Sequence, residues 1–423
     1  MISIGHNLAP YRNKPFFTGG ITDELATHEA RLTREGLPPI RFDRGDPTEQ
    51  HPKINAALIE YLKTDPKHRY GHIAGEGFYR QAASEYMARR FGVDNINFNG
   101  NDQELELCAL SGSNDGIFKT ICFVLGEGIM LLPFPGYPGY YDAAYEAGYR
   151  DITSTSNKRV LPYFVTPENN FRPDIEKIYD GLGTDRTKVR AIFINYPSNP
   201  TGAKATLEYY EKLVDFARRK GILIISDAAY TELYSPGSEP PCSILEIKGA
   251  KDVAIEFHSQ SKSHGITGLR LGWVTGNKLV IARMMHLTSI DNICAGPILI
   301  QKAGAEVLND DDGYTERMRR QYQSRREVLR EGLQSNGWKI VSDASNIGTF
   351  YEWAGVPDGK TSLAYALELI RKSGVVMIPG TLFSDNDLAP GSLAYGEGFM
   401  RLALLQSVEK TKEAIDRLSK QIE

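Results

Sequence analysis

Six polar residues follow three apolar runs of the sequence, each near the point where its run ends. They are Asn199 after residues 191–194, Asp227 and Tyr230 after residues 222–225, and Ser259, Lys262 and Arg270 after residues 253–257. Taken alone, each has an ordinary explanation: a turn for Asn199, a helix N-cap for Asp227 and a solvated loop for Lys262. Together they supply an amine that condenses with an aldehyde, an arginine and hydroxyls that bind a phosphate, and a carboxylate. The set therefore predicts a phosphorylated aldehyde held as a Schiff base of Lys262.

These apolar runs belong to an alternation of strands and helices between about residues 115 and 276. Short β-rich runs lie at 128–133, 189–196, 221–226, 253–257 and 269–275, and helical patterns separate them. Residues 207–220 repeat apolar side chains at helical spacing and end at Gly221, a helix stop. The order predicts an α/β large domain with a mostly parallel central sheet, which brings polar residues at the strand ends to one edge.

After about residue 307 the sequence changes to long, charged helical patterns at 317–336, 361–373 and 408–422. Short strand-like pieces lie at 338–341, 350–353, 375–378 and 399–404. This mixture predicts a smaller α+β domain. We therefore divide the chain into a large α/β domain at 48–307, a small C-terminal domain at 308–423, and an N-terminal segment at 1–47 that joins the small domain.

Composition restricts the classes of partner. The 423 residues carry 49 basic and 53 acidic side chains, for a formal charge of −4, and no basic block suited to nucleic acid. No apolar run approaches the length of a membrane span, and the N-terminus lacks a signal-peptide pattern. The four cysteines form no C-x-x-C pair, so no disulfide framework or thiolate zinc site is predicted. We expect a cytoplasmic protein that binds neither nucleic acid nor membrane.

The segment 259–273, which reads SQSKSHGITGLRLGW, resembles the pyridoxal-phosphate lysine signature of class I/II aminotransferases. Further motifs of this fold-type I, aspartate-aminotransferase-like family occur in the family's order from Tyr70 to Arg401. The resemblance implies pyridoxal 5'-phosphate as cofactor. It also implies that Lys262 forms the Schiff base and then moves the proton between the substrate Cα and the cofactor.

The resemblance assigns roles around the cofactor ring. Asp227 resembles the carboxylate that keeps the pyridine nitrogen protonated, so that the ring accepts electrons. Tyr230 and Asn199 occupy the positions that hydrogen-bond the phenolic oxygen. Tyr137 resembles the aromatic residue that stacks on the ring, although its Pro-Gly-Tyr-Pro context is also ordinary turn chemistry.

A second group of residues resembles the family's phosphate and substrate contacts. Ser113 and Asn114 precede a helical pattern, so their backbone N–H groups would face the phosphate at a helix N-terminus, together with Ser259 and Arg270. Arg401 matches the arginine that receives the substrate α-carboxylate, with Asn199 and the glycine Gly45 as further substrate contacts. Tyr70 sits where the family places a tyrosine from the neighbouring subunit, which implies a homodimer.

The pattern also departs from family members that act on dicarboxylic acids. Those carry a second arginine about thirty residues after the lysine, whereas residues 289–297 contain no basic side chain. Another arginine could still hold an acidic substrate. We interpret Asp291 in this stretch as a solvated loop residue, and we expect His72 and His264 to point toward the site. His68 and His72 have the spacing of metal ligands but lack a third ligand, so no metal is predicted.

We therefore predict an enzyme that moves an amino group between an L-amino acid and a 2-oxo acid. The same residues would also serve a pyridoxal-phosphate lyase or synthase, with elimination, replacement or cyclisation of an S-adenosylmethionine-like amino acid, or a racemase. A regulatory sensor domain lacks its DNA-binding partner here. A nicotinamide oxidoreductase is disfavoured because residues 75–80 break the G-x-G-x-x-G spacing.

Overall fold

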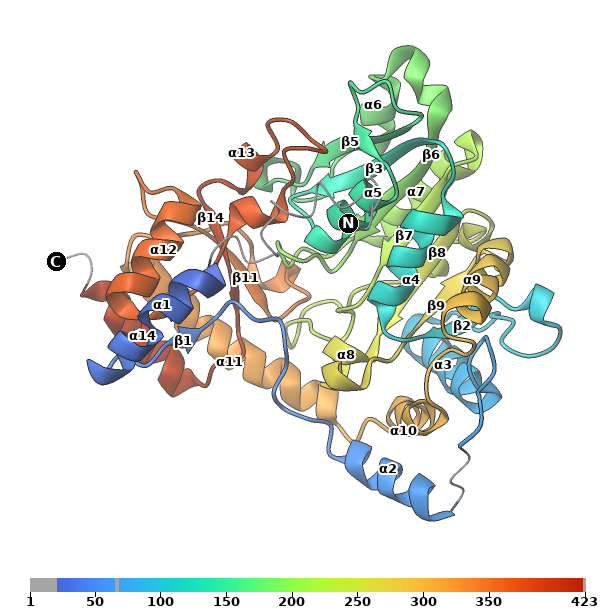
Figure 1. Cartoon of the computed structure of the whole chain (residues 1–423), viewed down its shortest axis with the longest axis horizontal. Coiled ribbons are helices and arrows are strands. Elements are labelled where there is room, and N and C mark those ends of the chain that lie inside the picture. Colours follow the sequence, from blue (N-terminus) through green and yellow to red (C-terminus); the bar gives the residue numbers. More distant parts are fainter. Residues whose placement is uncertain (1–20, 65–67, 421–423) are drawn as a thin grey trace, which may run out of the picture.

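The computed structural model describes residues 21–64 and 68–420. Residues 1–20, which open the predicted N-terminal segment, lie outside the described residues. Figure 1 shows two regions side by side, a large sheet with its helices and a smaller helix-rich region that contains the C-terminal elements. No helix among the described residues is both long and apolar enough to cross a membrane.

The large region is built on one sheet of eight strands in the part of the chain described. In spatial order they are β2 (Leu107–Leu110), β9 (Gly272–Gly276), β8 (Ala254–Ser259), β7 (Leu223–Asp227), β6 (Val189–Asn195), β3 (Gly128–Phe134), β5 (Lys158–Phe164) and β4 (Arg150–Asp151). All neighbours pair in parallel except that β9 runs antiparallel to both β8 and β2. The sheet is therefore mostly parallel, and the ends of β6, β7 and β8 lie next to one another.

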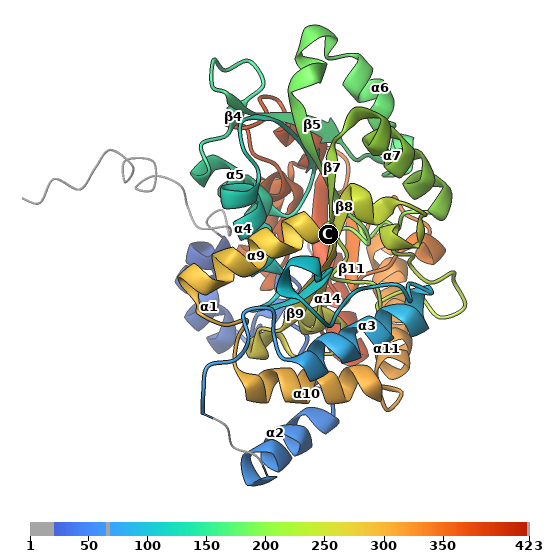
Figure 2. The same ribbon diagram turned by 90° about the vertical axis from the view of Figure 1, so that its right-hand side faces the viewer.

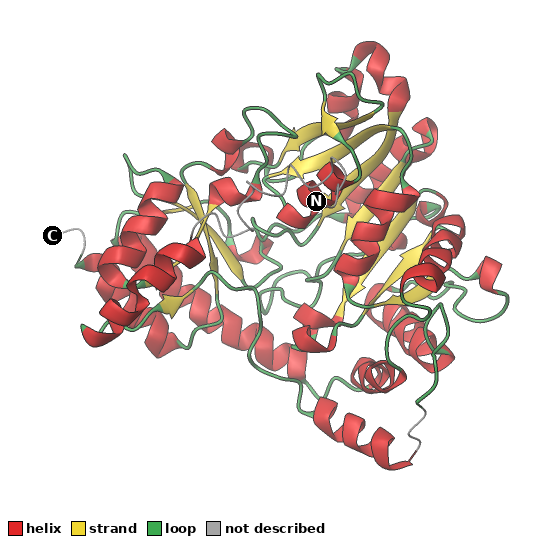
Figure 3. Cartoon of the chain, viewed as in Figure 1, coloured by secondary structure: helices red, strands yellow, loops and turns green. Residues whose placement is uncertain are grey.

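Helices cover both faces of this sheet (Figures 2 and 3). On one face lie α4 (Ser113–Lys119), α5 (Pro138–Glu146) and α9 (Lys278–Asp291), and on the other α3 (Gly77–Phe91), α6 (Ile175–Asp180), α7 (Leu207–Lys220) and α10 (Ile298–Asn309). Successive residues of β3 alternate between the two cores, Ile129 and Leu131 facing one and Met130 and Leu132 the other. Because both faces are buried, these strands carry mostly apolar side chains.

The smaller region combines a four-stranded antiparallel sheet with helices. The sheet has the order β10 (Lys339–Ile340), β11 (Tyr351–Gly355), β14 (Phe399–Ala403) and β13 (Ile378–Pro379), while β1 (Ile40–Arg41) pairs in parallel with β12 (Val375–Val376). The helices are α1 (Ile21–Arg34), α11 (Tyr314–Ser335), α12 (Ser362–Ser373), α13 (Leu393–Gly396) and α14 (Val408–Ser419). Elements from both ends of the chain share this core. The exact domain boundaries stay a prediction.

Two further helices complete the fold. Helix α2 (Lys53–Thr64) packs against α10, and α8 (Gln260–Ser263) follows β8 directly.

The helix predicted at residues 207–220 is present as α7, with Thr206 as N-cap and Gly221 as C-cap. These caps explain its bounds, because the Thr206 hydroxyl accepts the free N–H of Tyr209 and Gly221 adopts a left-handed conformation.

Several elements differ from the sequence-based expectations. The strand predicted at 269–275 occupies Gly272–Gly276, because Arg270 has a left-handed backbone (φ 53°) and Thr267–Leu269 form a 3₁₀ turn. The single strand-like piece at 375–378 is divided into β12 and β13, which pair with different neighbours. The helical pattern after Ser113 changes from α-helix to a π-helical turn at Thr120–Val124. None of these differences affects the carboxyl ends of β6, β7 and β8, which carry the predicted site residues.

Candidate active site

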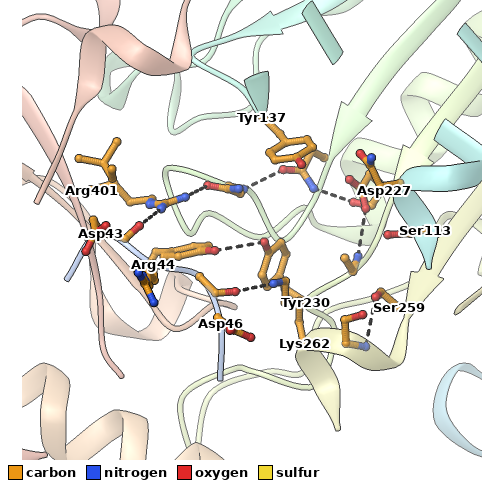
Figure 4. A pocket seen from close by; sticks show the side chains of 18 of the residues that line it. Asp43, Arg44, Asp46, Ser113, Tyr137, Asp227, Tyr230, Ser259, Lys262 and Arg401 are labelled. Atoms are coloured by element: carbon orange, nitrogen blue, oxygen red, sulfur yellow. Dashed lines mark hydrogen bonds between the residues drawn. The ribbon is translucent and has the colours of Figure 1, made fainter. Parts of the chain in front are cut away.

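A cavity of about 650 Å³ lies between the end of the large sheet and the smaller region (Figure 4). Every predicted site residue except Tyr70 lines it. These residues are Gly45, Ser113, Asn114, Tyr137, Asn199, Asp227, Tyr230, Ser259, Lys262, Arg270 and Arg401. They come from separate elements of both regions, so the fold brings together residues up to about 350 positions apart in the sequence.

The neighbouring ends of β6 and β7 hold two of these residues in place. Asn195, the last residue of β6, pairs with Asp227 at the end of β7. Its side-chain amide donates to the Asp227 carbonyl over 2.8 Å, and its Oδ1 accepts the Asn199 N–H over 2.7 Å. Asn195 thus fixes the loop that presents Asn199. Asn195 was not among the predicted site residues, although its position at a strand end was a signal.

Asp227 is buried at the deep end of the cavity. Its carboxylate accepts a 2.5 Å hydrogen bond from the Tyr140 hydroxyl and a 3.3 Å bond from the Ala229 N–H. Burial raises the pKa of Asp227 to about 6, although both hydrogen bonds and the nearby His258 oppose the shift. A carboxylate in this position is stabilised by a cationic partner. Tyr140 was not predicted, because its contact with Asp227 spans 87 residues.

Lys262 lies on α8 and extends into the cavity toward the segment before α2. Its amine donates a hydrogen bond to the Gly45 carbonyl. Burial lowers the pKa of Lys262 to about 8; the Asp46 carboxylate opposes this shift, and the positive charges of Arg401 and Arg270 add to it. About a tenth of the amine is therefore neutral at pH 7, far more than for an ordinary lysine, and the neutral amine is the form that a nucleophile or general base requires.

Ser259 begins the helix that carries Lys262. Its hydroxyl accepts the Ser261 N–H over 3.2 Å as the N-cap of α8, and its carbonyl accepts a 2.8 Å bond from the Ser263 hydroxyl. The Ser261 hydroxyl lines the same cavity and is buried without a hydrogen-bond partner among the described residues. The turn thus presents polar groups beside Lys262 that a ligand can engage.

A cradle of backbone N–H donors lies at the start of α4. The backbone N–H groups of Ser113 and Asn114 occupy the first turn of that helix, where they have no helical acceptor. Gly112 precedes them with φ +83°, and a Cβ there would lie 2.6 Å from Arg270 Nη2. The missing side chain at Gly112 therefore lets the Arg270 guanidinium approach the helix start, where N–H groups and positive charge suit a phosphate.

Arg401 enters the cavity from β14 of the smaller region. Its Nη1 donates to Asn199 Oδ1 over 2.9 Å, and its Nη2 donates to the Asp43 carbonyl over 2.7 Å. The guanidinium lies 4.3 Å from the centroid of the Tyr351 ring, and its Nε is buried without a partner among the described residues. Arg401 thus links the two regions and keeps donor capacity for a carboxylate.

Three tyrosines shape the space between these groups. The Tyr230 hydroxyl lies 3.4 Å from that of Tyr351, and Tyr137 projects into the cavity with its ring edge-on to Tyr140 at 5.4 Å (Figure 4). A Cβ at position 45 would lie 2.1 Å from the Tyr351 hydroxyl. Glycine is therefore required at Gly45 for the segment to pass this close to Tyr351.

Some predicted positions are wrong. Asp291 is exposed, as predicted, but it is the last residue of α9 and not a loop residue, and its carboxylate lies 3.0 Å from the buried amine of Lys119. His72 does not line the cavity and lies 3.5 Å from the Asp102 carboxylate. His264 is buried on the other side of α8, with its ring 6.2 Å from that of His51. In each case a partner distant in sequence determines where the side chain lies.

The cavity suits pyridoxal phosphate, the cofactor that the sequence resemblance implies. It has an N–H and arginine cradle at Gly112 and Arg270, a buried carboxylate at Asp227, an amine at Lys262 and an aromatic ring at Tyr137. These donors match a flat, phosphorylated pyridine with an aldehyde. Among the described residues, no group of three or more His, Cys, Asp or Glu side chains could hold a metal ion.

Comparisons with known proteins agree with this geometry. The model of the family "Aminotransferase class I and II" matches residues 39–418. The LL-diaminopimelate aminotransferase of Halothermothrix orenii is 36% identical over 97% of this chain and 96% of its own length. That of Aquifex aeolicus is 36% identical over 93% and 94%. The crystal structure of an aromatic aminotransferase from Pyrococcus horikoshii superposes with a TM-score of 0.78, at 25% identity over 95% of this chain and 98% of its own.

These similarities confirm the predicted fold, cofactor and reaction type. They support transamination and give no support to the lyase, synthase or racemase alternative. Substrates of such an enzyme are an amino acid and a 2-oxo acid. The chain belongs to the class I and II aminotransferase family and is a pyridoxal-phosphate-dependent aminotransferase.

Proposed function

We propose that this aminotransferase takes its amino group from LL-diaminopimelate or a close analogue and passes it to a 2-oxo acid. The observation that supports transamination itself is the single cavity in which Lys262, Asp227 and Arg401 meet. The choice of amino donor rests on the curated relatives, which match nearly the whole chain and are named for that substrate.

When bound, pyridoxal phosphate supplies an aldehyde that captures amino groups and a ring that withdraws electrons from the substrate Cα. Asp227 would hold a proton on the ring nitrogen, because its buried carboxylate lacks any other strong cationic partner in the described cavity. Tyr230 and Asn199 would donate hydrogen bonds to the phenolic oxygen. Tyr137 would stack on the ring.

Lys262 acts at two stages of the reaction. It would hold the cofactor aldehyde through its amine, whose pKa of about 8 favours the neutral form more than that of an ordinary lysine. With substrate bound, the free amine would be placed to take up and give back the proton of the substrate Cα. A buried amine suits this transfer, because a pKa near the working pH allows it both to accept and to donate a proton.

Substrate and phosphate are held at opposite ends of the cavity. Arg401 binds the α-carboxylate, using a guanidinium already oriented by Asn199 and the Asp43 carbonyl. The N–H groups of Ser113 and Asn114, the Ser259 hydroxyl and Arg270 would hold the phosphate. Gly45 borders the substrate from the smaller region, and its lack of a side chain leaves room beside Tyr351.

The proposal includes a homodimer in which Tyr70 reaches the cavity of the neighbouring subunit. Tyr70 is 72% exposed and does not line its own cavity, and Ile59 and Leu62 on α2 are also half exposed. Exposed aromatic and aliphatic side chains of this kind suit a protein interface. A cytoplasmic location belongs to the same proposal, since all four cysteines carry free thiols, as suits a reducing compartment.

The dimer arrangement is tested by co-expressing Tyr70→Ala and Lys262→Ala subunits with different tags. Each homodimer is expected to be impaired. In the hybrid, one cavity combines Lys262 of the first subunit with Tyr70 of the second, so this dimer should regain close to half the wild-type activity. If Tyr70 acts within its own subunit, the purified hybrid will show no recovery.

The substrate proposal is tested by steady-state assays with LL-diaminopimelate and a panel of other amino acids, each with 2-oxoglutarate as acceptor. We expect the highest kcat/KM for LL-diaminopimelate, and no turnover in Lys262→Ala. A higher kcat/KM for an aliphatic or aromatic amino acid would reject this donor while leaving the aminotransferase assignment in place.

A further inference from the structure

Arg44 lies on a segment that is anchored to the active site on both sides. The carbonyl of Asp43 accepts a 2.7 Å bond from Arg401, and the carbonyl of Gly45 accepts a bond from the Lys262 amine. Arg44 therefore spans the interval between the proposed α-carboxylate contact and the reacting amine. Its side chain lines the cavity at the exposed side (Figure 4).

The other cations of the cavity already have partners in the protein. Arg41 makes two hydrogen bonds to the Asp43 carboxylate, Nε to Oδ1 at 2.9 Å and Nη2 to Oδ2 at 2.5 Å. Arg270 donates to the Thr267 carbonyl over 3.0 Å, and Arg401 donates to Asn199 over 2.9 Å. Each of these three arginines thus has a hydrogen-bond partner within residues 21–64 and 68–420, whereas Arg44 has none there.

No hydrogen bond or ion pair joins Arg44 to another described residue. The two acidic residues close to Arg44 in sequence have other partners. Asp46 accepts a hydrogen bond from the Thr267 hydroxyl, and the carboxylate of Asp43 accepts hydrogen bonds from Arg41. No described residue therefore occupies the N–H donors of the Arg44 guanidinium, and a ligand in the cavity can accept hydrogen bonds from them. A planar fork of this kind binds a carboxylate through two parallel hydrogen bonds.

The position of Arg44 determines which carboxylate it can receive. The α-carboxylate of the substrate is assigned to Arg401, so a second guanidinium at the cavity entrance meets the far end of the substrate. The connection between α9 and α10 supplies no cation, and its Asp291 is paired with Lys119. Among the described residues of the cavity, Arg44 is therefore the cation available to bind the distal carboxylate of a substrate.

We propose that Arg44 determines specificity for substrates with two acidic ends by binding their distal carboxylate. This inference rests on the proposed function, because LL-diaminopimelate and a dicarboxylic 2-oxo acid both carry such a group. It also makes the preferred amino acceptor a dicarboxylic 2-oxo acid. In this chain, Arg44 thus replaces the arginine that other family members place in the segment corresponding to residues 289–297.

The test compares binding of glutarate with that of pentanoate, which has the same carbon count but one carboxylate. Both are titrated into the purified holoenzyme by calorimetry, for the wild type and for Arg44→Ala, Arg44→Lys and Arg320→Ala. Arg320 is an exposed arginine on α11 outside the cavity and serves as the matched control. This binding readout does not depend on turnover.

We expect the wild type and Arg320→Ala to bind glutarate at least tenfold more tightly than pentanoate. In Arg44→Ala this preference should fall to about twofold, and Arg44→Lys should recover part of it, because a lysine keeps the charge but not the fork. Pentanoate affinity should stay within twofold, since that ligand contacts only Arg401. Cofactor absorbance should be unchanged in all variants.

Two outcomes would overturn the proposal: no preference for glutarate in the wild type, or the same preference in Arg44→Ala as in the wild type. An equal loss of affinity for both ligands would also contradict it, because that indicates a general structural role. Failure of the proposed function is separate. It would show as absent turnover of LL-diaminopimelate in a wild type whose glutarate preference still depends on Arg44.

Discussion

Replacement of Asp227 by asparagine tests whether the buried charge of this carboxylate destabilises the cofactor-free protein. The pKa of this carboxyl is about 6 rather than 3.8, with burial as the main cause. Each pH unit corresponds to about 1.4 kcal/mol, so ionised Asp227 destabilises the cofactor-free protein by about 3 kcal/mol at pH 7.5. The asparagine variant has no charge to bury and keeps an oxygen for the Tyr140 hydroxyl.

The sign of the pH dependence follows from the raised pKa. The penalty is fully present above about pH 6 and decreases as the pH falls from 6 toward 4, because the folded protein then takes up the proton more readily than the unfolded chain. At pH 5 about half of it, roughly 1.5 kcal/mol, should remain. The stability advantage of Asp227→Asn over the wild type should therefore shrink by about 1.5 kcal/mol between pH 7.5 and pH 5.

The assay is urea unfolding of both cofactor-free proteins at the two pH values, followed by circular dichroism. Asp215→Asn, an exposed substitution on α7, is the control and should show a small difference that does not change with pH. With cofactor, Asp227→Asn should lose at least 100-fold in kcat, since an uncompensated ring nitrogen costs about 3 kcal/mol or more. An advantage that is equal at both pH values would refute the argument from burial.

Three further predictions concern other parts of the cavity. The rate at which the cofactor-free protein binds pyridoxal phosphate should rise with pH, reach half its maximum near pH 8 and level off above about pH 9, because only the neutral amine of Lys262 reacts. Stopped-flow absorbance would measure this rate, and a flat profile from pH 6 to 9 would contradict the assignment. Gly112→Ala should weaken cofactor binding at least tenfold, measured by equilibrium dialysis, since the new methyl group would lie 2.6 Å from Arg270 in a backbone conformation with φ +83°. Arg401→Lys should raise KM for the amino donor about tenfold or more with little change in cofactor affinity, because a lysine cannot form two parallel bonds; equal effects on both quantities would indicate a structural role.

The order of elements in the large domain could be predicted because its strands are buried on both faces and separated by capped helices. The runs that became β6, β7 and β8 are mostly apolar, and each ends at a polar residue that the structure places in the cavity. A parallel sheet collects such ends at one edge. The residues that carry most of the chemistry were therefore recognisable from local sequence.

The contacts that complete the site could not be predicted in the same way. Tyr140 reaches Asp227 from a helix 87 residues away, and Arg401 reaches Asp43 across 358 residues. The antiparallel direction of β9 depends on the left-handed turn at Arg270, which has no distinctive local pattern. Arg44 stood out only once the structure showed which other arginines already have partners.

The most direct test of the central claim is a single half-reaction of the purified holoenzyme, without any 2-oxo acid. The protein is mixed with LL-diaminopimelate, its absorbance spectrum is followed, and the released cofactor and products are quantified by mass spectrometry. We expect pyridoxamine phosphate and a 2-oxo acid in equal amounts, one per active site, and neither product in Lys262→Ala. Retention of the pyridoxal form with release of ammonia or a cleaved side chain would contradict it.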